Sequence, residues 1–241
     1  ETELSTGQRI TAETILIAVG GTPTLPKIVG IEHAITSNEM FDFKLLPVSI
    51  LIVGGGYIAS EFAGIMKGLG VKTTQYYRGD QILRGFDNEA RDLVAGDMVK
   101  RGIDLRCGLN LEKIEKTPKG LLVTDTKGKT QVFDAVMYAT GRSANTKNLI
   151  DPSVGVRLGA KGEIVVDEYS QATVPSIYAV GDVTDRVNLT PVAIHEAMAF
   201  IATVFRGQPT AVDHTLIPTA IFTQPEMGAI GLSEEKARLQ G

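Results

Sequence analysis

The chain has little of what disulfide, metal–thiolate or membrane chemistry would need. Cys107 is its only cysteine, so the sequence offers no disulfide framework, no CxxC motif and no cysteine metal cluster. No apolar run approaches the roughly 20 residues that span a bilayer. The first residues, ETELSTGQRI, have neither a basic start nor an apolar signal core. We therefore expect a cytoplasmic protein without a membrane-embedded segment or a bound metal.

Clustered positive charge is also missing. The formal net charge is −4 at pH 7, from 24 Lys and Arg residues against 28 Asp and Glu residues, and no stretch is dense in basic residues. Binding to a nucleic-acid backbone or to anionic lipid relies on such clusters. With 43% hydrophobic residues, the chain can bury one or two cores. We expect neither nucleic acid nor a membrane among its partners.

Short apolar runs alternate with helical patterns along the middle of the chain. The runs, typical of strands buried in a parallel sheet, are TILIAVGG, VSILIVGGG, VKTTQYY, AVMYATGR and SIYAVGD. Residues 57–69 and 88–101 carry apolar side chains at helical spacing, and Gly102 ends the second pattern. After Arg106, the turn signals TPKG and TKGK predict a β-meander. The pattern predicts a doubly wound α/β unit followed by a meander.

The outer segments do not fit this unit and suggest a second domain whose halves flank it. Residues 1–35 offer one strand and a GGTPTLP turn, while residues 145–209 offer further strands and a helix from about Pro191 to Arg206. The sequence lacks an initial Met and finishes on SEEKARLQG, which reads like an interrupted helix. These features suggest a piece of a longer protein.

A glycine pattern lies between the second apolar run and the first helix. Gly54, Gly56 and Ala59 form G-x-G-x-x-A directly after a strand. In such a turn the first glycine permits the sharp bend, the second lets the backbone approach a pyrophosphate, and the small third residue lets helix and strand pack closely. The free N–H groups and dipole of the helix would hold the phosphates. A purely structural glycine turn is the alternative.

The residues after the next strand indicate which nucleotide would bind. An NAD site usually has an acidic residue about 20 positions after the glycines, where it binds the ribose hydroxyls. This place falls to Tyr77, which is followed by Arg78 and then by Arg84. Guanidinium groups match the geometry of a phosphate, so the two arginines favour NADPH, with its 2′-phosphate, over NADH. Simple solvation of both side chains is the alternative.

Five motifs occur in an order typical of one protein family. They are GGGYIASEFAGIMKGLG, YRGDQILRGFD, YATGR, TVPSIYAVGD and NLTPVAIHEA. The chain resembles the pyridine nucleotide-disulfide oxidoreductases, flavoproteins in which an NAD(P)H domain is inserted into an FAD domain and a dimerisation domain follows. The resemblance implies FAD and NADPH as cofactors and a homodimer. It assigns the FAD domain to residues 1–35 and 145–209, the Rossmann-like NADPH domain with its meander to residues 36–144, and the start of the dimerisation domain to residues 210–241.

The resemblance also implies roles for single residues. Tyr57 matches a tyrosine that covers the flavin and moves when nicotinamide enters, and Glu61 matches a glutamate beside both rings. We expect these two to act in catalysis. Arg142 matches an arginine near NADPH, and Asp182 a carboxylate that binds the ribityl chain of FAD. The residues expected at the cofactors are Gly54, Gly56, Tyr57, Ile58, Ala59, Glu61, Arg78, Arg84, Ala139, Thr140, Gly141, Arg142, Gly181, Asp182, Leu189, Thr190 and Pro191.

Within the family, the chain most resembles the branch that reduces glutathione disulfide in plants and many bacteria. Arg78 and Arg84 are the strongest sign, because the lipoamide branch has an acidic residue in this place. Met198 stands where some of these enzymes carry an arginine that contacts glutathione, so a trypanothione-type or other small-disulfide reductase stays open. The redox-active cysteine pair of the family has no counterpart in this sequence, and neither Cys107, His195 nor His214 replaces its catalytic groups. Two further interpretations stay open: a non-catalytic nucleotide-binding module or redox sensor, and a flavoenzyme acting on quinone, oxygen or mercuric ion.

Overall fold

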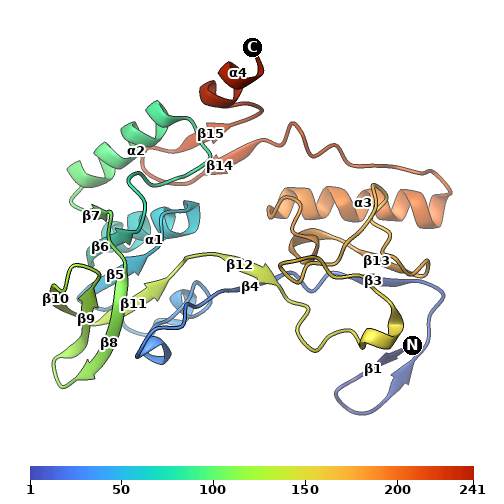
Figure 1. Cartoon of the computed structure of the whole chain (residues 1–241), viewed down its shortest axis with the longest axis horizontal. Helices are drawn as coiled ribbons and strands as arrows, with labels where there is room; N and C mark the ends of the chain where they lie inside the picture. The colour runs from blue at the N-terminus through green and yellow to red at the C-terminus, as the bar shows by residue number, and fades with distance from the viewer. The chain divides into compact units, whose positions relative to one another are not determined.

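The computed structural model describes all 241 residues, which divide into two compact units, each assembled from two stretches of chain (Figure 1). The central unit comprises Pro23–Gly141 and Pro218–Gly241, and the flanking unit comprises Glu1–Thr22 and Arg142–Ile217. None of the helices combines the length and the apolar character needed to cross a bilayer.

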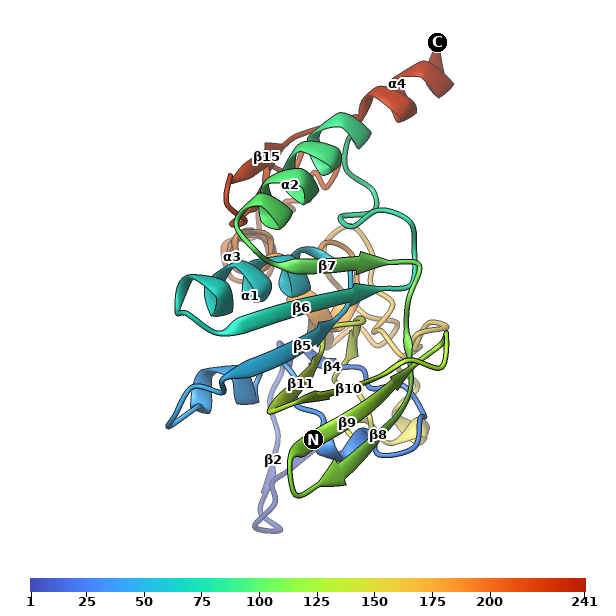
Figure 2. The same cartoon turned by 90° about the vertical axis from the view of Figure 1, so that its left-hand side faces the viewer.

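The central unit is built on a four-stranded parallel sheet. Its strands, in spatial order, are β11 (Ala135–Tyr138), β5 (Ser49–Val53), β6 (Lys72–Tyr77) and β7 (Asp104–Cys107), as Figure 2 shows. Helices α1 (Tyr57–Gly68) and α2 (Asn88–Lys100) make the crossovers from β5 to β6 and from β6 to β7. This arrangement confirms the α/β fold class and both predicted helices.

Alternate residues of the strands point into two different cores, as the pleat requires. Ile50 and Ile52 of β5 pack with residues of α1 and α2, including Ala63 and Met98. Leu51 and Val53 of the same strand pack on the opposite side. There they meet the predicted meander, an antiparallel sheet of β8 (Leu111–Thr117), β9 (Gly120–Asp125) and β10 (Thr130–Phe133). The parallel sheet is therefore covered on one face by helices and on the other by the meander.

The last 24 residues of the chain, Pro218–Gly241, belong to the central unit although they are distant from it in sequence. They form a hairpin of β14 (Thr219–Ile221) and β15 (Met227–Ala229), followed by α4 (Glu234–Gln240). Ile221 is fully buried in the core shared by α1 and α2. The N–H of Phe222 donates to Glu61 Oε1 at 2.8 Å, and the N–H of Glu234 donates to Asp87 Oδ2 at 3.2 Å. These contacts attach the hairpin and α4 to the two crossover helices.

The flanking unit has less regular structure. The apolar runs TILIAVGG and SIYAVGD do contain strands, but β3 (Ile15–Ile17) and β13 (Ile177–Ala179) pair with each other in a separate two-stranded parallel sheet. The short pairs β1 (Thr2–Glu3) with β2 (Arg9–Ile10) and β4 (Gly21–Pro23) with β12 (Arg142–Ala144) complete its strands. Four 3-10 turns occur along the chain, η1 (Ile31–His33), η2 (Glu39–Asp42), η3 (Pro152–Val154) and η4 (Gly181–Thr184). Helix α3 (Thr190–Arg206) follows η4, close to the predicted bounds.

Candidate functional site

The predicted phosphate-binding turn joins the end of β5 to the start of α1. Gly54 has a φ of 148°, and a Cβ there would lie 2.3 Å from the carbonyl oxygen of Ala139, so the packing of the chain itself demands glycine. A Cβ at Gly56 would meet no protein atom within 4 Å. Internal packing therefore explains Gly54 but not Gly56. The lack of a side chain at Gly56 fits a backbone that a pyrophosphate approaches closely.

Three hydrogen bonds hold this turn in place. The N–H of Gly54 donates to Tyr76 O at 2.9 Å, and the N–H of Leu83 donates to Gly55 O at 2.6 Å. The fully buried Gln75 donates from Nε2 to Gly54 O at 3.0 Å. Gln75 was not among the predicted site residues; its only signal in the sequence is a long polar side chain inside a buried strand.

The start of α1 lacks a side-chain cap from its N-cap residue. Gly56 is the N-cap of the helix and, as a glycine, provides no side-chain acceptor for the first N–H groups of α1. Of the predicted residues in this first turn, Tyr57 and Ile58 are half-buried and Ala59 is fully buried against the sheet. None of these residues has the Ser, Thr, Asp or Asn side chain that usually caps a helix N-terminus.

The two predicted arginines lie on the loop that follows β6. The ring of Tyr77 packs against the turn at Gly55. It lies so close that a Cβ added at Gly55 would be 2.3 Å from the ring. Arg78 follows Tyr77, and Arg84 follows Leu83, whose N–H is bonded to Gly55. The side chains of Arg78 and Arg84 are exposed and make neither a hydrogen bond nor an ion pair. Each of these two arginines, which have no acidic partner, thus follows a residue that contacts the glycine turn.

The remaining predicted residues of the central unit have structural partners. Glu61 accepts the N–H of Phe222 and so links α1 to the hairpin. The N–H of Ala139 donates to Val53 O at 2.8 Å, which continues the pairing of β11 with β5. Gly141 O accepts the N–H of Thr24 at 3.0 Å, and Thr140 Oγ1 donates to Thr24 O at 3.4 Å. These bonds fix the backbone of residues 139–141 at the end of β11.

Three of the predicted residues come together in the flanking unit. Arg142 donates from Nη2 to Gly21 O at 2.5 Å, and its Nε lies 3.9 Å from Asp182 Oδ2. Asp182 is the second residue of η4, directly after Gly181, whose φ is 74°. The structure therefore places Arg142 beside Asp182, in a different unit from the glycine turn with which the nucleotide prediction associated it.

The predicted residues 189–191 form the start of α3. Leu189 is the N-cap without a side-chain cap, and Thr190 and Pro191 are exposed in the first turn. Proline suits this position because its missing N–H would have had no acceptor within the helix.

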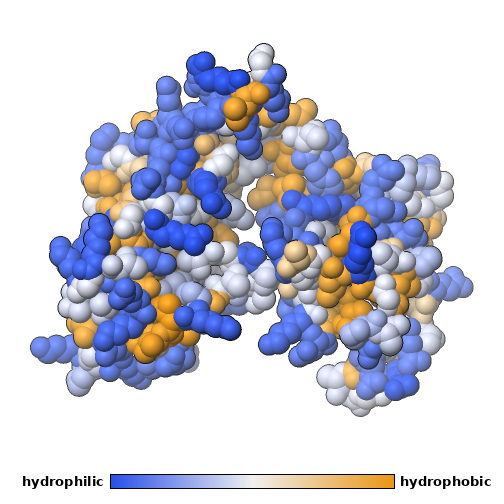
Figure 3. Space-filling model, in the orientation of Figure 1, coloured by the Kyte–Doolittle hydropathy of each residue, from blue (hydrophilic) through white to orange (hydrophobic).

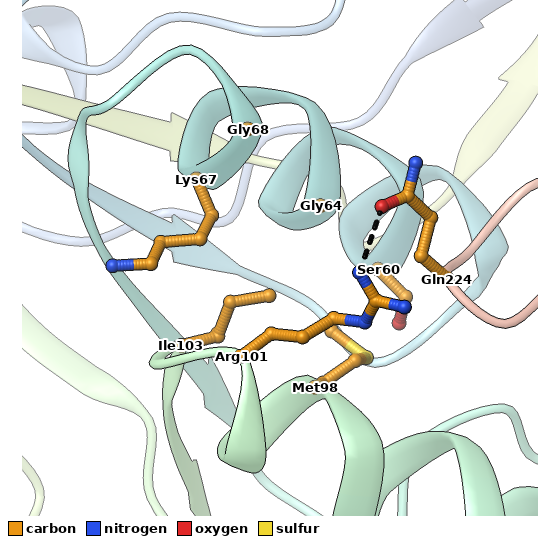
Figure 4. Close-up of a pocket in the computed structure, with 8 residues that line it drawn as sticks. All are labelled: Ser60, Gly64, Lys67, Gly68, Met98, Arg101, Ile103 and Gln224. Atoms are coloured by element: carbon orange, nitrogen blue, oxygen red, sulfur yellow. Dashed lines mark hydrogen bonds between the residues drawn. The ribbon is translucent and has the colours of Figure 1, made fainter.

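The central unit also has a cavity of about 230 Å³, and none of the predicted residues is among those that line it (Figure 4). Residues of α1, the end of α2 and the hairpin line it, and Arg101 Nη1 donates to Gln224 Oε1 at 3.3 Å across one side. No group of three or more His, Cys, Asp or Glu side chains is placed to hold a metal ion. Burial raises the pKa of the half-buried thiol of Cys107, the last residue of β7, which lowers its thiolate fraction and its reactivity.

The chain is similar in sequence to a known protein family and to two characterised reductases. Residues 1–197 match the family described as pyridine nucleotide-disulphide oxidoreductase. The chain is 49% identical to a glutathione reductase of Burkholderia cepacia, over 97% of this chain and 52% of that protein. It is 47% identical to a trypanothione reductase of Trypanosoma congolense, over 95% of this chain and 48% of that protein. The chain therefore spans about half the length of these curated relatives.

A solved structure shares the fold. The HOCl-induced flavoprotein disulfide reductase RclA from Escherichia coli superimposes with a TM-score of 0.93 and 26% sequence identity, over 99% of this chain and 55% of that one. A match of this extent includes both units and the segments that carry the predicted residues.

Proposed function

The chain belongs to the pyridine nucleotide-disulphide oxidoreductase family, and from this premise we propose that it forms the NADPH-binding region and part of the FAD-binding region of a disulfide reductase. The observation that carries the NADPH assignment is the open turn at Gly56, with an uncapped helix behind it and with Arg78 and Arg84 unpaired beside it. The turn suits the pyrophosphate, and the arginines suit the 2′-phosphate.

The FAD assignment rests on the flanking unit. Asp182 would accept hydrogen bonds from the ribityl hydroxyls, and Arg142 holds its carboxylate on one side. The backbone of Leu189, Thr190 and Pro191 at the start of α3 would face the flavin ring. Bound FAD supplies the capacity to take a hydride from NADPH and pass two electrons to a disulfide.

The protein's own residues then orient the reactants. Tyr57 would shield the flavin from water until nicotinamide enters, and Glu61, whose carboxylate accepts the N–H of Phe222, would lie beside both rings. The net reaction consumes NADPH and one proton, breaks one S–S bond and releases two thiols. A pair of protein cysteines must relay the electrons in this proposal, whereas this sequence contains a single cysteine.

We propose glutathione disulfide as the substrate of the complete protein, in a homodimer of the cytoplasm. The glutathione reductase of Burkholderia cepacia, at 49% identity, supports this choice. A trypanothione-type disulfide is the second candidate, supported by the relative from Trypanosoma congolense at 47% identity and by the exposed, uncharged Met198 on α3. A nucleotide-binding module without catalysis is the alternative of a different class.

The test measures oxidation of NADPH by the complete protein with glutathione disulfide as the acceptor. NADH in place of NADPH, and the disulfides of trypanothione and of γ-glutamylcysteine in place of glutathione disulfide, are the controls. We expect rapid oxidation only with NADPH and glutathione disulfide. Reduction of bound flavin without turnover of glutathione disulfide would contradict the proposal that glutathione disulfide is the substrate. A complete protein that holds no flavin would contradict the proposal that it is a flavin-dependent reductase.

A further inference from the structure

A buried carboxylate lies behind the proposed FAD-binding turn. Glu196, on α3, is 1% exposed, although charged side chains are almost never fully buried unless they are paired. Its Oε2 accepts the N–H of Gly181 at 2.6 Å. Its Oε1 lies 2.9 Å from Arg186 Nη2 and 2.8 Å from His214 Nε2. All four residues belong to the flanking unit.

The two carboxylate oxygens of Glu196 therefore bind different kinds of group. Oε1 is engaged by two side chains, one before α3 and one after it, which is a stabilising arrangement for a buried charge. Oε2 is engaged by the backbone at the point where β13 has ended and η4 begins. No backbone acceptor binds the N–H of Gly181, so Glu196 replaces the bond that a neighbouring strand would have provided.

Gly181 is also held from its other side. Thr184 Oγ1 donates to the carbonyl oxygen of Gly181 at 2.9 Å. Arg186 Nε in turn donates to Thr184 Oγ1 at 3.2 Å, so Glu196, Arg186 and Thr184 form one network around a single residue of the backbone. Asp182 is the next residue along the chain. With both polar groups of Gly181 fixed, the backbone that carries Asp182 has little freedom to turn.

We propose that Glu196 is a positioning residue for the flavin site: through its bond to Gly181 it sets the orientation of Asp182 toward the ribityl chain. The inference rests on the proposed function, because it requires Asp182 to bind FAD. It assigns to Glu196 a role that the motif-based prediction, restricted to residues 189–191 of this helix region, did not include.

The test compares FAD affinity in variants of the complete protein, measured by quenching of flavin fluorescence during reconstitution of the apoprotein. Glu196→Ala removes the acceptor for Gly181, and we expect FAD to bind about 10- to 100-fold more weakly, the usual effect of losing a hydrogen bond to a charged group. His214→Asn is the matched control, since it disturbs the same carboxylate only at Oε1. We expect its FAD affinity within about twofold of the wild type even where its unfolding temperature falls.

Glu196→Gln separates charge from position. Arg186 has Thr184 and Ser170 as further partners, at 3.2 and 3.0 Å, whereas the N–H of Gly181 has only Glu196. The amide oxygen should therefore turn toward Gly181 and preserve FAD affinity within about threefold of the wild type. Equal losses of affinity in the Ala, Gln and His214 variants would assign Glu196 to stability alone and overturn the proposal.

A further variant tests the proposal if the Glu196→Ala protein does not fold. Thr184→Val is nearly isosteric and releases the carbonyl side of Gly181, so FAD affinity should fall about threefold or more while the unit stays folded. Unchanged FAD affinity in Thr184→Val would show that the geometry of this turn does not control the site. A wild-type protein that binds no FAD would instead contradict the proposed function, which distinguishes the two failures.

Discussion

Substitution by alanine is expected to affect stability at one glycine of the nucleotide turn and NADPH affinity at the other. Gly54→Ala forces a Cβ to 2.3 Å from Ala139 O at a φ of 148°. The substitution should therefore lower the free energy of unfolding by about 2 kcal/mol or more. Gly56 has φ −83° and ψ 177° and space around its Cα, so Gly56→Ala should change stability by no more than about 0.5 kcal/mol. Its NADPH affinity should nevertheless fall about tenfold or more.

Urea denaturation and NADPH titration of the two glycine variants check this prediction together. The decisive observation is a folded Gly56→Ala variant. If that variant binds NADPH as tightly as the wild type, the close approach of a pyrophosphate to Gly56 is wrong.

Replacing both arginines of the loop after β6 tests the choice of nucleotide. The side chains of Arg78 and Arg84 are exposed, so the double alanine variant should fold normally. Its Kd for NADPH should rise about 10- to 100-fold, while its Kd for NADH stays nearly unchanged. Arg101→Ala, which removes an exposed arginine bonded only to Gln224, is the control for lost positive charge. Equal losses for the two nucleotides would contradict the 2′-phosphate assignment.

The sequence predicts residues of this site only where their role is local. Gly54 and Ala59 were recognisable because a strand, a sharp turn and a helix follow one another within a few positions. Gln75 was not, because its bond to Gly54 exists only once β6 lies beside β5. The same holds for Glu196, which reaches Gly181 across 15 positions of chain. Spacing alone does not reveal such contacts.

At the scale of elements, Asp87 joins the helices α2 and α4 of the central unit. Its Oδ1 caps α2 by accepting the N–H of Glu89 at 3.1 Å, and its Oδ2 accepts the N–H of Glu234 at the start of α4. Asp87→Ala should lower the free energy of unfolding by about 1–2 kcal/mol, the usual effect of losing an N-cap. Asp97→Ala is the control, since Asp97 makes only an exposed ion pair with Lys100 and should change stability by less than about 0.5 kcal/mol.

Urea denaturation followed by circular dichroism measures both aspartate variants. The control variant keeps the helix and its cap, so it isolates the effect of the cap from that of a lost surface charge. Similar stability of the two variants would mean that neither the cap nor the attachment of α4 contributes measurably.

Elements with a strong local pattern were predicted, and elements defined by distant contacts were not. The helices α1 and α2 and the meander follow from periodicity and turn signals, and the structure contains all three. The pairing of β3 with β13 could not be predicted, because about 160 residues separate two equally apolar strands. Nor could the docking of β14 and β15 on the crossover helices, which depends on Ile221 and on the backbone of Phe222.

At the scale of the whole molecule, the two units differ in how much apolar surface they bury. The central unit holds core clusters of fifteen and ten buried residues, whereas the flanking unit holds a cluster of three, Ile164, Ala179 and Val183. Helix α3 also leaves large apolar side chains exposed, namely Ile194, Met198, Ile201 and Phe205. Apolar patches are visible among the hydrophilic residues on the face shown in Figure 3. Burial of apolar surface is the main favourable contribution to folding, so the units should differ in stability.

We therefore expect the 241-residue chain to unfold in two steps, the flanking unit first. Native-state hydrogen exchange measured by mass spectrometry would report this as slower exchange in peptides covering β5, β6 and β11 than in those covering β3 and β13. Gly54→Ala provides an internal check, because its strain lies in the central unit and should speed exchange there while leaving β3 and β13 unchanged. Equal protection of both units, or a single cooperative transition in which Gly54→Ala speeds exchange everywhere, would show that the small core of the flanking unit does not fold and unfold independently.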